Sequence, residues 1–423
     1  MSVSMRRVEP AAVSDLLRKP VDNETVSAAA EIVEDVRRRG ETAVRDHAVR
    51  FGDMGPDQSL AVSRLEIEEA FASLPASEAG LLDRVTDRIR SFARAQRDSV
   101  TDIDVEVDGG RAGHRWLPVS AAGAYAPGGR YPLPSTVLMT VVPARVAGVG
   151  EMWVSSPKPS AMTLAAAAVA GVDGLLRVGG AQAIAALAFG VVGPRCDIVV
   201  GPGNRWVTAA KKVLFGEVGI DGLAGPSEIV VIADSEADPA LVAADLIAQA
   251  EHDVDALPIL ITTDPAMLRL VNDEIDRQMD NLSTARVAGP ALREGFAVVV
   301  DSVRQAAEIS DRVAPEHLAL HVARPDEASD RFANYGSMFR GGHSGETFAD
   351  YGIGPNHVLP TGGSSRFQSG LSPMTFLKAP TWLELTDPGE VMSDTARLAR
   401  HEGLEGHARA AEARFSPSGE AAG

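Results

Sequence analysis

Apolar residues recur at three- and four-residue intervals over residues 23–97, for example at Ala30 and Val33. This spacing places them on one face of a helix, so we predict a mainly helical N-terminal region. Residues 14–19 form a further short helical candidate. Glycine and proline interrupt the pattern over residues 123–134, which marks a change of architecture.

Beyond this crossing, short apolar runs alternate with helical patterns of roughly 10–15 residues. The predicted strands are 151–155, 174–178, 197–200, 229–233, 257–261, 297–300 and 318–322. The predicted helices are 160–170, 181–189, 208–214, 239–252, 265–279 and 303–312. Such alternation is typical of βαβ units, so we expect an α/β protein with parallel sheets. The pattern starts afresh near residue 229, which indicates two α/β domains.

The C-terminal part changes character again. Residues 360–373 are rich in glycine and serine, and residues 387–414 form a polar, helical tail. Such a tail buries little surface alone, so we expect it to dock on another domain or another subunit.

Composition narrows the class of protein. A chain of 423 residues is too long for one hydrophobic core, so two or more domains are expected. A net charge of −18 argues against a nucleic-acid or anionic-membrane partner. The single cysteine, Cys196, excludes an intramolecular disulfide and suits a reducing compartment. Neither a signal peptide nor an apolar run of membrane-spanning length is present in the sequence, so we expect a soluble, cytoplasmic protein.

Four groups of polar residues carry candidate chemistry. Gln249 and His252 lie three residues apart near the end of a predicted helix and share one face, which indicates either a metal site or a solvated helix end. Glu316 beside His317 is either a proton-relaying acid–base pair or a capping glutamate beside an exposed histidine. The other two groups are Asp350 and His357 in a glycine-rich loop, and Glu402 and His407 in the polar tail. In isolation, Glu402 and His407 are most simply surface residues.

Glycine-bearing stretches at 128–129, 179–182, 201–204 and 225–228 could cradle a nucleotide. The second and third follow strands and precede helices, which points backbone N–H groups at a phosphate. The G-x-G-x-x-G fingerprint of dinucleotide-binding folds is nevertheless absent. The residues alone therefore predict an α/β enzyme with a candidate metal site, and no particular reaction.

Taken together and in order, these stretches resemble the histidinol dehydrogenase family over nearly the full length. The matching segments are GAYAPGG (123–129), VGGAQAIAALA (178–188), VGPGN (200–204), IDGLAGPSE (220–228), DLIAQAEHD (245–253), APEHL (314–318), DYGIGPNHVLPTGG (350–363), SGLS (369–372) and EGLEGHA (402–408). The resemblance implies two Rossmann-like domains with parallel sheets and incomplete dinucleotide motifs, plus small helical segments at both ends. The implied boundaries are an N-terminal arm (1–21), a first Rossmann-like domain with the catalytic pair (22–120 and 230–370), a second, NAD-binding one (121–229), and a C-terminal tail (371–423).

The resemblance also implies a reaction, which is the oxidation of L-histidinol to L-histidine through L-histidinal with two NAD. One zinc ion per subunit is expected on Gln249, His252, Asp350 and His407. The same four residues are expected to contact the substrate, together with Ser227, His317 and Glu402. Glu316 and His317 match the catalytic pair. His317 is expected to move the alcohol proton, and Glu316 to activate water.

Further implications concern NAD and the partner subunit. Tyr125, Gln182 and Asn204 match NAD contacts, and His357 is expected to line the pocket. The family is a homodimer in which the tail of one subunit completes the other's active site. Departures from the family's pattern at 130–134, 156–160, 205–206 and 348–349 leave another small polar alcohol, such as a sulfonate diol, as an alternative substrate. Two other classes stay open, a metal-dependent hydrolase and a non-catalytic binding module.

Overall fold

The computed structural model describes residues 4–16, 20–128 and 131–414. The predicted helix at 14–19 and the glycine pair 128–129 therefore lie partly outside the described residues. Within the first of these, the chain forms a 3-10 helix, η1 (Pro10–Leu16). The chain divides into two compact units, one of residues 1–97 and 119–376 and one of residues 98–118 and 377–423.

Two six-stranded sheets organise the first unit. The sheet that we call the 121–220 sheet has the order β10-β9-β6-β7-β8-β2 and consists of β6 (Ala121–Tyr125), β7 (Glu151–Ser155), β8 (Gly174–Leu176), β9 (Ile198–Val200), β10 (Gly219–Ile220) and the edge strand β2 (Ala61–Val62). The 228–340 sheet has the order β1-β13-β12-β11-β14-β15 and consists of β11 (Glu228–Ala233), β12 (Leu257–Thr262), β13 (Phe296–Val299), β14 (His317–His321), β15 (Ser337–Arg340) and the edge strand β1 (Arg6–Arg7). All strand pairs in both sheets are parallel except β2 with β8. The predicted α/β fold with parallel sheets is thereby confirmed.

The five main strands of each sheet follow one spatial order. Numbered along the chain, they lie third, second, first, fourth, fifth, as β8-β7-β6-β9-β10 and as β13-β12-β11-β14-β15. The renewed pattern that the sequence shows near residue 229 is therefore a repetition of topology.

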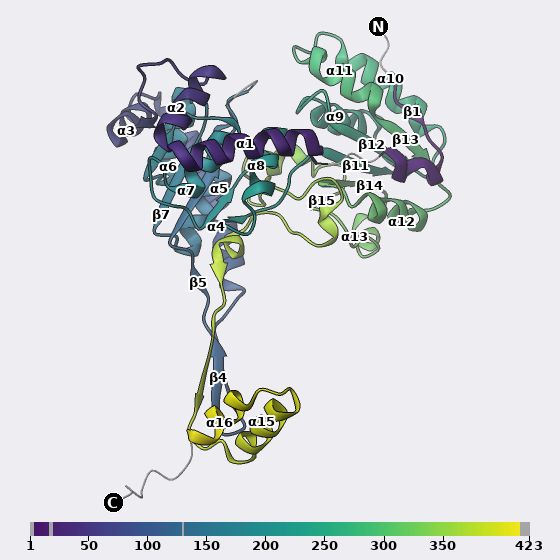
Figure 1. The fold of residues 1–423 in the computed structure, drawn as a ribbon. Helices are drawn as coiled ribbons and strands as arrows, with labels where there is room; N and C mark the ends of the chain where they lie inside the picture. Colours follow the sequence, from purple (N-terminus) through teal and green to yellow (C-terminus); the bar gives the residue numbers. More distant parts are fainter. Residues whose placement is uncertain (1–3, 17–19, 129–130, 415–423) are drawn as a thin grey trace, which may run out of the picture. The chain divides into compact units, whose positions relative to one another are not determined.

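Helices cover both faces of the 228–340 sheet (Figure 1). Ile229 and Val231 of β11 pack toward α9 (Pro239–Ala250), α10 (Met267–Met279) and α11 (Ala285–Glu294). Val230 and Ile232 pack toward η1, α12 (Val303–Val313) and α13 (Pro325–Ser329). Because successive side chains of a strand point to opposite faces, a strand buried on both sides is apolar throughout, which explains the short uninterrupted runs in the sequence.

The 121–220 sheet carries α1 (Asn23–Arg39), α2 (Glu41–Arg50), α7 (Gly180–Phe189) and α8 (Arg205–Leu214) in one hydrophobic cluster. Its remaining helices are α5 (Pro134–Ala147), which packs on β6, β7 and α6 (Ala161–Ala170); α3 (Arg64–Ala72), which packs on α6; and α4 (Ala76–Asp98). Strand β6 and helix α5 are absent from the sequence-based prediction, although β6 lies in the middle of the sheet. Three short elements, α14 (Glu346–Asp350), η2 (Ser364–Arg366) and η3 (Pro373–Phe376), complete the unit.

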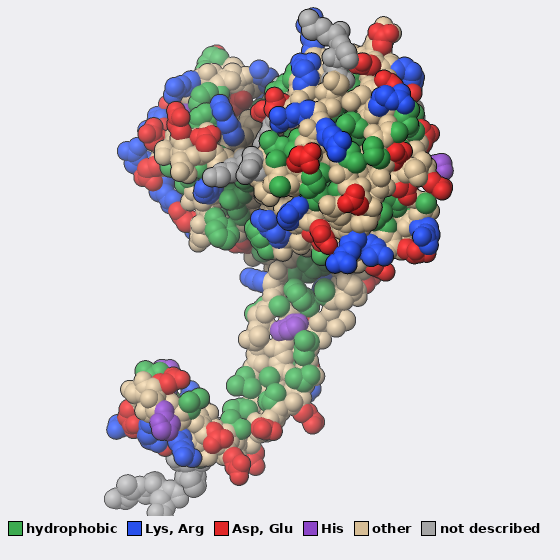
Figure 2. Space-filling model, turned by 90° about the vertical axis from the view of Figure 1, so that its right-hand side faces the viewer, with side chains coloured by type: hydrophobic (Ala, Val, Ile, Leu, Met, Phe, Trp, Pro, Cys, Tyr) green, Lys and Arg blue, Asp and Glu red, His purple; other side chains and the backbone are tan. Residues whose placement is uncertain are grey.

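The second unit is small. Strands β3 (Ile103–Val107), β4 (Gly110–His114) and β17 (Thr381–Leu385) form an antiparallel sheet, and β5 (Leu117–Pro118) pairs with β16 (Leu377–Lys378). The predicted single tail helix is two helices, α15 (Gly389–His401) and α16 (Glu405–Ala413), which pack through Ala396, Ala399 and Ala408. Hydrophobic side chains are exposed along the strands of this unit, among them Ile103, Val105 and Val107 (Figure 2).

Among the described residues, no helix is both long and apolar enough to cross a membrane.

Candidate functional site

The predicted polar residues of the 228–340 sheet gather at the amino ends of its strands. Helix α9 begins at Pro239, capped by Asp238, and runs back toward the start of β12, so Gln249 in its last turn lies beside that edge. Glu316 and His317 stand where β14 begins. Ligand sites in open parallel sheets usually form at the carboxyl ends of strands, so this placement is an exception to that rule.

A buried hydrogen bond joins two of these residues. The His317 Nδ1 and Gln249 Oε1 atoms are 2.9 Å apart, and the two residues are 3% and 0% exposed. Because Gln249 Oε1 is an acceptor, Nδ1–H donates to it, and Nε2 of the imidazole is left as a base. The alternative interpretation of an exposed histidine beside a capping glutamate is therefore wrong.

Burial shifts both members of the Glu316–His317 pair toward their neutral forms. It lowers the pKa of His317 to about 4 and raises the pKa of Glu316 to about 8. The Glu316 Oε2 atom accepts the backbone N–H of Glu228, at 3.2 Å, so the first residue of β11 holds this carboxyl in place. The pair thus offers an unprotonated imidazole and a carboxyl group that can exchange a proton near neutral pH.

His252 and Asp350 form an ion pair next to this pair. Helix α14 packs on α9, which brings Asp350 Oδ2 to 3.3 Å from His252 Nε2. Burial opposes both pKa shifts, but the mutual hydrogen bond raises the pKa of His252 to about 10 and lowers that of Asp350 to about 2. The charges of Glu346 and Glu316 raise the pKa of His252 further, so this corner of the site favours a positive charge.

These residues also fit a divalent cation. Imidazole nitrogen, carboxylate oxygen and amide oxygen are ligands that zinc accepts. Over residues 4–16, 20–128 and 131–414, no three His, Cys, Asp or Glu side chains are grouped closely enough to hold a metal. With the Gln249 amide oxygen added, His252 and Asp350 provide three metal ligands, one fewer than a four-coordinate site needs.

The residues expected to contact a nucleotide lie at the carboxyl ends of the 121–220 strands. Tyr125 ends β6, Gln182 lies in the first turn of α7, and Asn204 caps α8 by accepting the N–H groups of Trp206 and Val207. Gln182 is 1% exposed and its Oε1 has no partner among the described residues. A buried acceptor without a donor indicates a place where a ligand donates a hydrogen bond.

Comparison with known proteins identifies the family of the chain. Residues 17–415 match the family model described as "Histidinol dehydrogenase". The histidinol dehydrogenase of Ruegeria pomeroyi is 44% identical over 408 residues, 94% of each chain, and that of Lactiplantibacillus plantarum is 40% identical over 402 residues, 93% of this chain and 94% of that one. The crystal structure of histidinol dehydrogenase from Elizabethkingia anophelis superposes with a TM-score of 0.90 at 31% identity, covering 98% of each chain. The chain belongs to the histidinol dehydrogenase family. It is accordingly an oxidoreductase that acts on a small molecule, as the sequence predicts.

Sequence reasoning missed two buried carboxyl groups in this member of the histidinol dehydrogenase family. Glu346 is 0% exposed, and its Oε2 lies 3.4 Å from His317 Nδ1. Glu228 accepts the N–H of Gly362 at 3.0 Å, and burial raises its pKa to about 7. The signal for Glu346 is its position four residues before Asp350, which places both on one face of a helix.

Two further predicted residues adjoin the cluster. His357 approaches the Asp350 carbonyl through Nδ1, at 2.9 Å, and Thr136 Oγ1 through Nε2, at 3.3 Å. Thr136 belongs to α5, the helix that follows β6, so His357 links the loop of Asp350 to the 121–220 part. Ser227 directly precedes β11, and its carbonyl accepts the N–H of Leu257.

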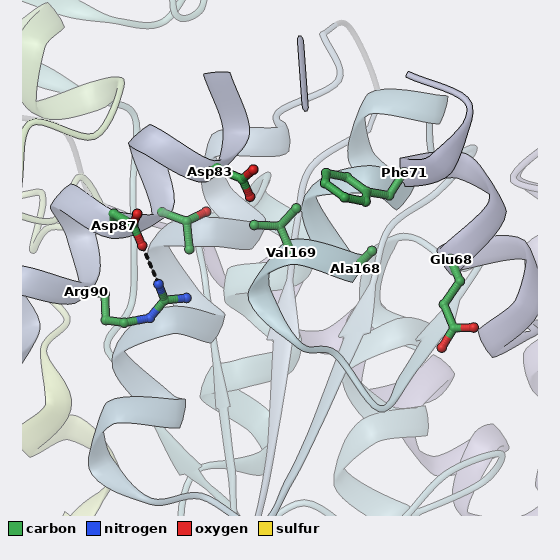
Figure 3. A pocket seen from close by; sticks show the side chains of 8 residues that line it. Glu68, Phe71, Asp83, Asp87, Arg90, Ala168 and Val169 are labelled. Atoms are coloured by element: carbon green, nitrogen blue, oxygen red, sulfur yellow. Dashed lines mark hydrogen bonds and ion pairs between the residues drawn. The ribbon is translucent and has the colours of Figure 1, made fainter. Parts of the chain in front are cut away.

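Glu402 and His407 belong to the second unit, where both are exposed. His407 lines a hollow of about 550 Å³ between α15, α16 and the end of β17. Another hollow, of about 360 Å³, lies between α3, α4 and α6 in the first unit (Figure 3). Its rim carries Glu68, Asp83 and the ion pair of Asp87 with Arg90. The residues that match the histidinol dehydrogenase motifs are not among those lining the latter hollow.

Proposed function

We propose that this chain oxidises L-histidinol to L-histidine through L-histidinal, a four-electron reaction that consumes two NAD⁺ and one water. The observation that carries the proposal is the convergence of five polar residues from three separate segments at the amino ends of the 228–340 strands, namely Gln249, His252, Glu316, His317 and Asp350. Membership of the histidinol dehydrogenase family supplies the substrate.

Zinc binding is proposed for Gln249, His252, Asp350 and His407. Bound zinc would hold the imidazole and amine of the substrate and so fix the position of the reacting carbon. The electrostatics around His252 support a cation here, because the carboxylates that stabilise its protonated form also favour a divalent ion. Gln249 connects this corner to the base, since its Oε1 has two lone pairs and already accepts from His317.

His317 and Glu316 divide the proton transfers between them. The free Nε2 of His317 takes the proton of the alcohol in the first oxidation, and that of the aldehyde hydrate in the second. Glu316 takes a proton from the water that attacks the aldehyde, a role that suits a carboxyl whose pKa burial raises to about 8. Bound NAD⁺ would accept one hydride in each oxidation.

NAD binding is proposed at Tyr125, Gln182 and Asn204. The strand order β8-β7-β6-β9-β10 is that of the doubly wound sheets that bind dinucleotides, which supports this edge of the 121–220 sheet. Asn204 follows the fourth strand and Gln182 the third, so the two lie on opposite sides of the point where the strand order reverses. A dinucleotide spans such a point.

We further propose that Glu402 and His407 act in the active site of a second copy of this chain, as a homodimer with shared sites. Two observations support this. The first unit offers three donors for a four-coordinate ion, and both tail residues present exposed side chains. Exposed hydrophobic residues on the second unit, such as Val105 and Leu383, are also typical of a subunit contact.

The decisive experiment is an assay of the purified protein with L-histidinol and NAD⁺, followed by NADH absorbance. Two NADH per L-histidinol, together with loss of activity in a chelator and its return with zinc, are expected. A sulfonate diol in the same assay tests the alternative substrate. Turnover of that diol but not of L-histidinol would refute the proposed substrate, and hydrolysis without any nucleotide would refute the dehydrogenase chemistry.

A further inference from the structure

Asp53 reaches the turn between β8 and α7 from a distant part of the chain. It follows α2, and its Oδ2 accepts the backbone N–H of Gly179 at 2.8 Å and the Gln182 Nε2–H at 3.1 Å. Sequence analysis did not find Asp53, because 125 residues separate it from this turn and it belongs to the N-terminal helical region. It touches the residue to which we assign NAD binding, Gln182.

Two hydrogen-bond acceptors at this turn have no donor within the described residues. One is Gln182 Oε1, which is buried, and the other is Asp53 Oδ1, since both bonds to Asp53 end on Oδ2. Both lie close to the turn backbone. A Cβ added to Gly179 would stand 3.2 Å from Asp53 Oδ1, and one added to Gly180 would stand 3.1 Å from Gln182 Oε1. The Gln182–Asp53 hydrogen bond joins the two side chains that carry these acceptors.

A pair of adjacent acceptors is complementary to a vicinal diol, which brings two O–H donors. The buried Gln182 Oε1 is of a kind that is rarely left unpaired, and Asp53 beside it is half-buried, so a ligand with two neighbouring hydroxyl groups can donate to both. The ribose rings of NAD⁺ carry such diols, and a carboxylate that accepts from a ribose hydroxyl is a known device of dinucleotide-binding folds. The Tyr125 hydroxyl accepts from Gly180 N–H at 3.4 Å and retains its own proton as a donor.

The topology decides which ribose is meant. Asp53 and Gln182 lie beyond the third strand, β8, whereas the chain continues from the fifth strand, β10, through residues 221–227 into β11. Strand β11 pairs with β14, where the proposed catalytic pair stands. The reacting nicotinamide belongs on the side of the catalytic pair. The opposite end of the dinucleotide, the adenosine, therefore belongs on the side of β8.

We propose that Asp53 binds the 2′-hydroxyl of the adenosine ribose of NAD⁺ and excludes NADP⁺. This inference rests on the proposed NAD dependence. A 2′-phosphate replaces the hydroxyl donor by further acceptors and adds negative charge beside a carboxylate, so both hydrogen bonding and charge oppose it. Lys158, whose charge also acts on Asp53, would remain as a cation for that phosphate once the carboxylate is removed.

The test is direct binding of three nucleotides, measured by calorimetry on the full-length zinc-loaded protein without substrate. The probes are NAD⁺, its analogue with 2′-deoxyadenosine, and NADP⁺. The variants are Asp53→Asn and Asp53→Ser, and the matched control is Asp57→Asn, an exposed aspartate of the same loop. Thermal unfolding of each variant shows whether it is folded.

For the unmodified protein we expect tight binding of NAD⁺ only. In both Asp53 variants the dissociation constant of NAD⁺ should rise about 10- to 100-fold, the usual effect of losing a hydrogen bond to a charged group. The deoxy analogue should then bind as well as NAD⁺, and the preference over NADP⁺ should fall by at least about tenfold. Asp57→Asn should change none of these values.

Three outcomes would overturn the inference. The first is an unchanged ratio of NADP⁺ to NAD⁺ dissociation constants in the folded Asp53 variants, and the second is equal binding of NAD⁺ and the deoxy analogue by the unmodified protein. Either leaves the proposed NAD dependence intact. The third is an unmodified protein that binds no dinucleotide, which refutes the NAD dependence together with the role of Asp53.

Discussion

A buried ion pair beneath the proposed NAD loop allows a quantitative prediction. Lys211 Nζ donates to Asp221 Oδ1 at 2.6 Å and to the Gly201 carbonyl at 2.5 Å, while Asp221 Oδ2 accepts the Gly201 N–H at 2.6 Å. The pair therefore binds both polar groups of Gly201, the residue that opens the loop to Asn204. Gly201 has φ +106 and packs against the Tyr125 carbonyl, so only glycine fits there.

Replacing Lys211 by methionine should destabilise the protein strongly. The side chains of Lys211 and Asp221 are 3% and 8% exposed, so Lys211→Met leaves a carboxylate buried without its partner. Breaking a buried pair in this way costs about 3–5 kcal/mol. Adding Asp221→Asn removes the remaining charge, and the new amide oxygen can still accept the Gly201 N–H. The double variant should therefore be more stable than Lys211→Met alone.

Urea unfolding followed by tryptophan fluorescence measures these differences, because Trp206 lies in α8 beside the pair and Trp153 lies in β7. The control is Lys212→Met, an exposed neighbour on the same helix, which should change stability by no more than about 0.5 kcal/mol. A double variant whose loss equals the sum of the two single losses would contradict the reasoning, because it would show that the two charges do not interact.

Three other predictions concern the active site and the 121–220 sheet. Glu316→Gln should retain oxidation of L-histidinol to the aldehyde and lose most of the oxidation of added L-histidinal, as measured by single-turnover NADH formation; equal loss of both steps would contradict the assigned role. Co-expressed His407→Ala and His317→Ala subunits should recover up to about half of the activity in purified heterodimers, because one of the two sites then has both residues, whereas inactive heterodimers would contradict shared sites. The Cys196 thiol, whose pKa burial raises to about 12, should react with a thiol reagent only as fast as the 121–220 sheet opens, and therefore much faster in urea; rapid labelling of the folded protein would contradict its burial.

Much of the fold follows from the sequence because its strands are buried on both faces. Six consecutive buried residues in β11 and six in β12 produce apolar runs that stand out against amphipathic helices. Strand β6 gives no such run, because it consists of small residues and one tyrosine. A Cβ at Gly123 would stand only 3.0 Å from Leu187, so close packing of α7 requires a residue type that sequence rules assign to turns.

Helix α5 was not predicted because it is buried on nearly all sides. Ten of its fourteen residues are buried and Pro143 lies inside it, so it has neither a polar face nor the usual periodicity. The antiparallel sheet of the second unit was also not predicted, since β3 and β17 are mostly exposed and lack alternation between buried and exposed positions.

The candidate site was predictable where its residues are neighbours in sequence. Gln249 with His252, and Glu316 with His317, are adjacent or three apart, so spacing alone marked them as pairs. The contact between the two pairs arises from the order of the strands, because β14 lies next to β11 across 83 residues of intervening chain. Asp53 depends on a still more distant contact and leaves no local signal.

The two sheets share one strand order, yet their proposed sites lie at opposite ends of the strands. The catalytic residues lie at the amino ends of the 228–340 strands, and the nucleotide-binding residues lie at the carboxyl ends of the 121–220 strands. The loops that follow β11, β12 and β13, at residues 234–238, 263–266 and 300–302, lie at the carboxyl ends of these strands. Doubly wound sheets usually carry their ligand sites at these ends, but here the proposed catalytic residues lie at the other end. For the protein engineer, these loops are the natural places to insert an affinity tag or a fluorescent reporter into the chain while substrate turnover is preserved.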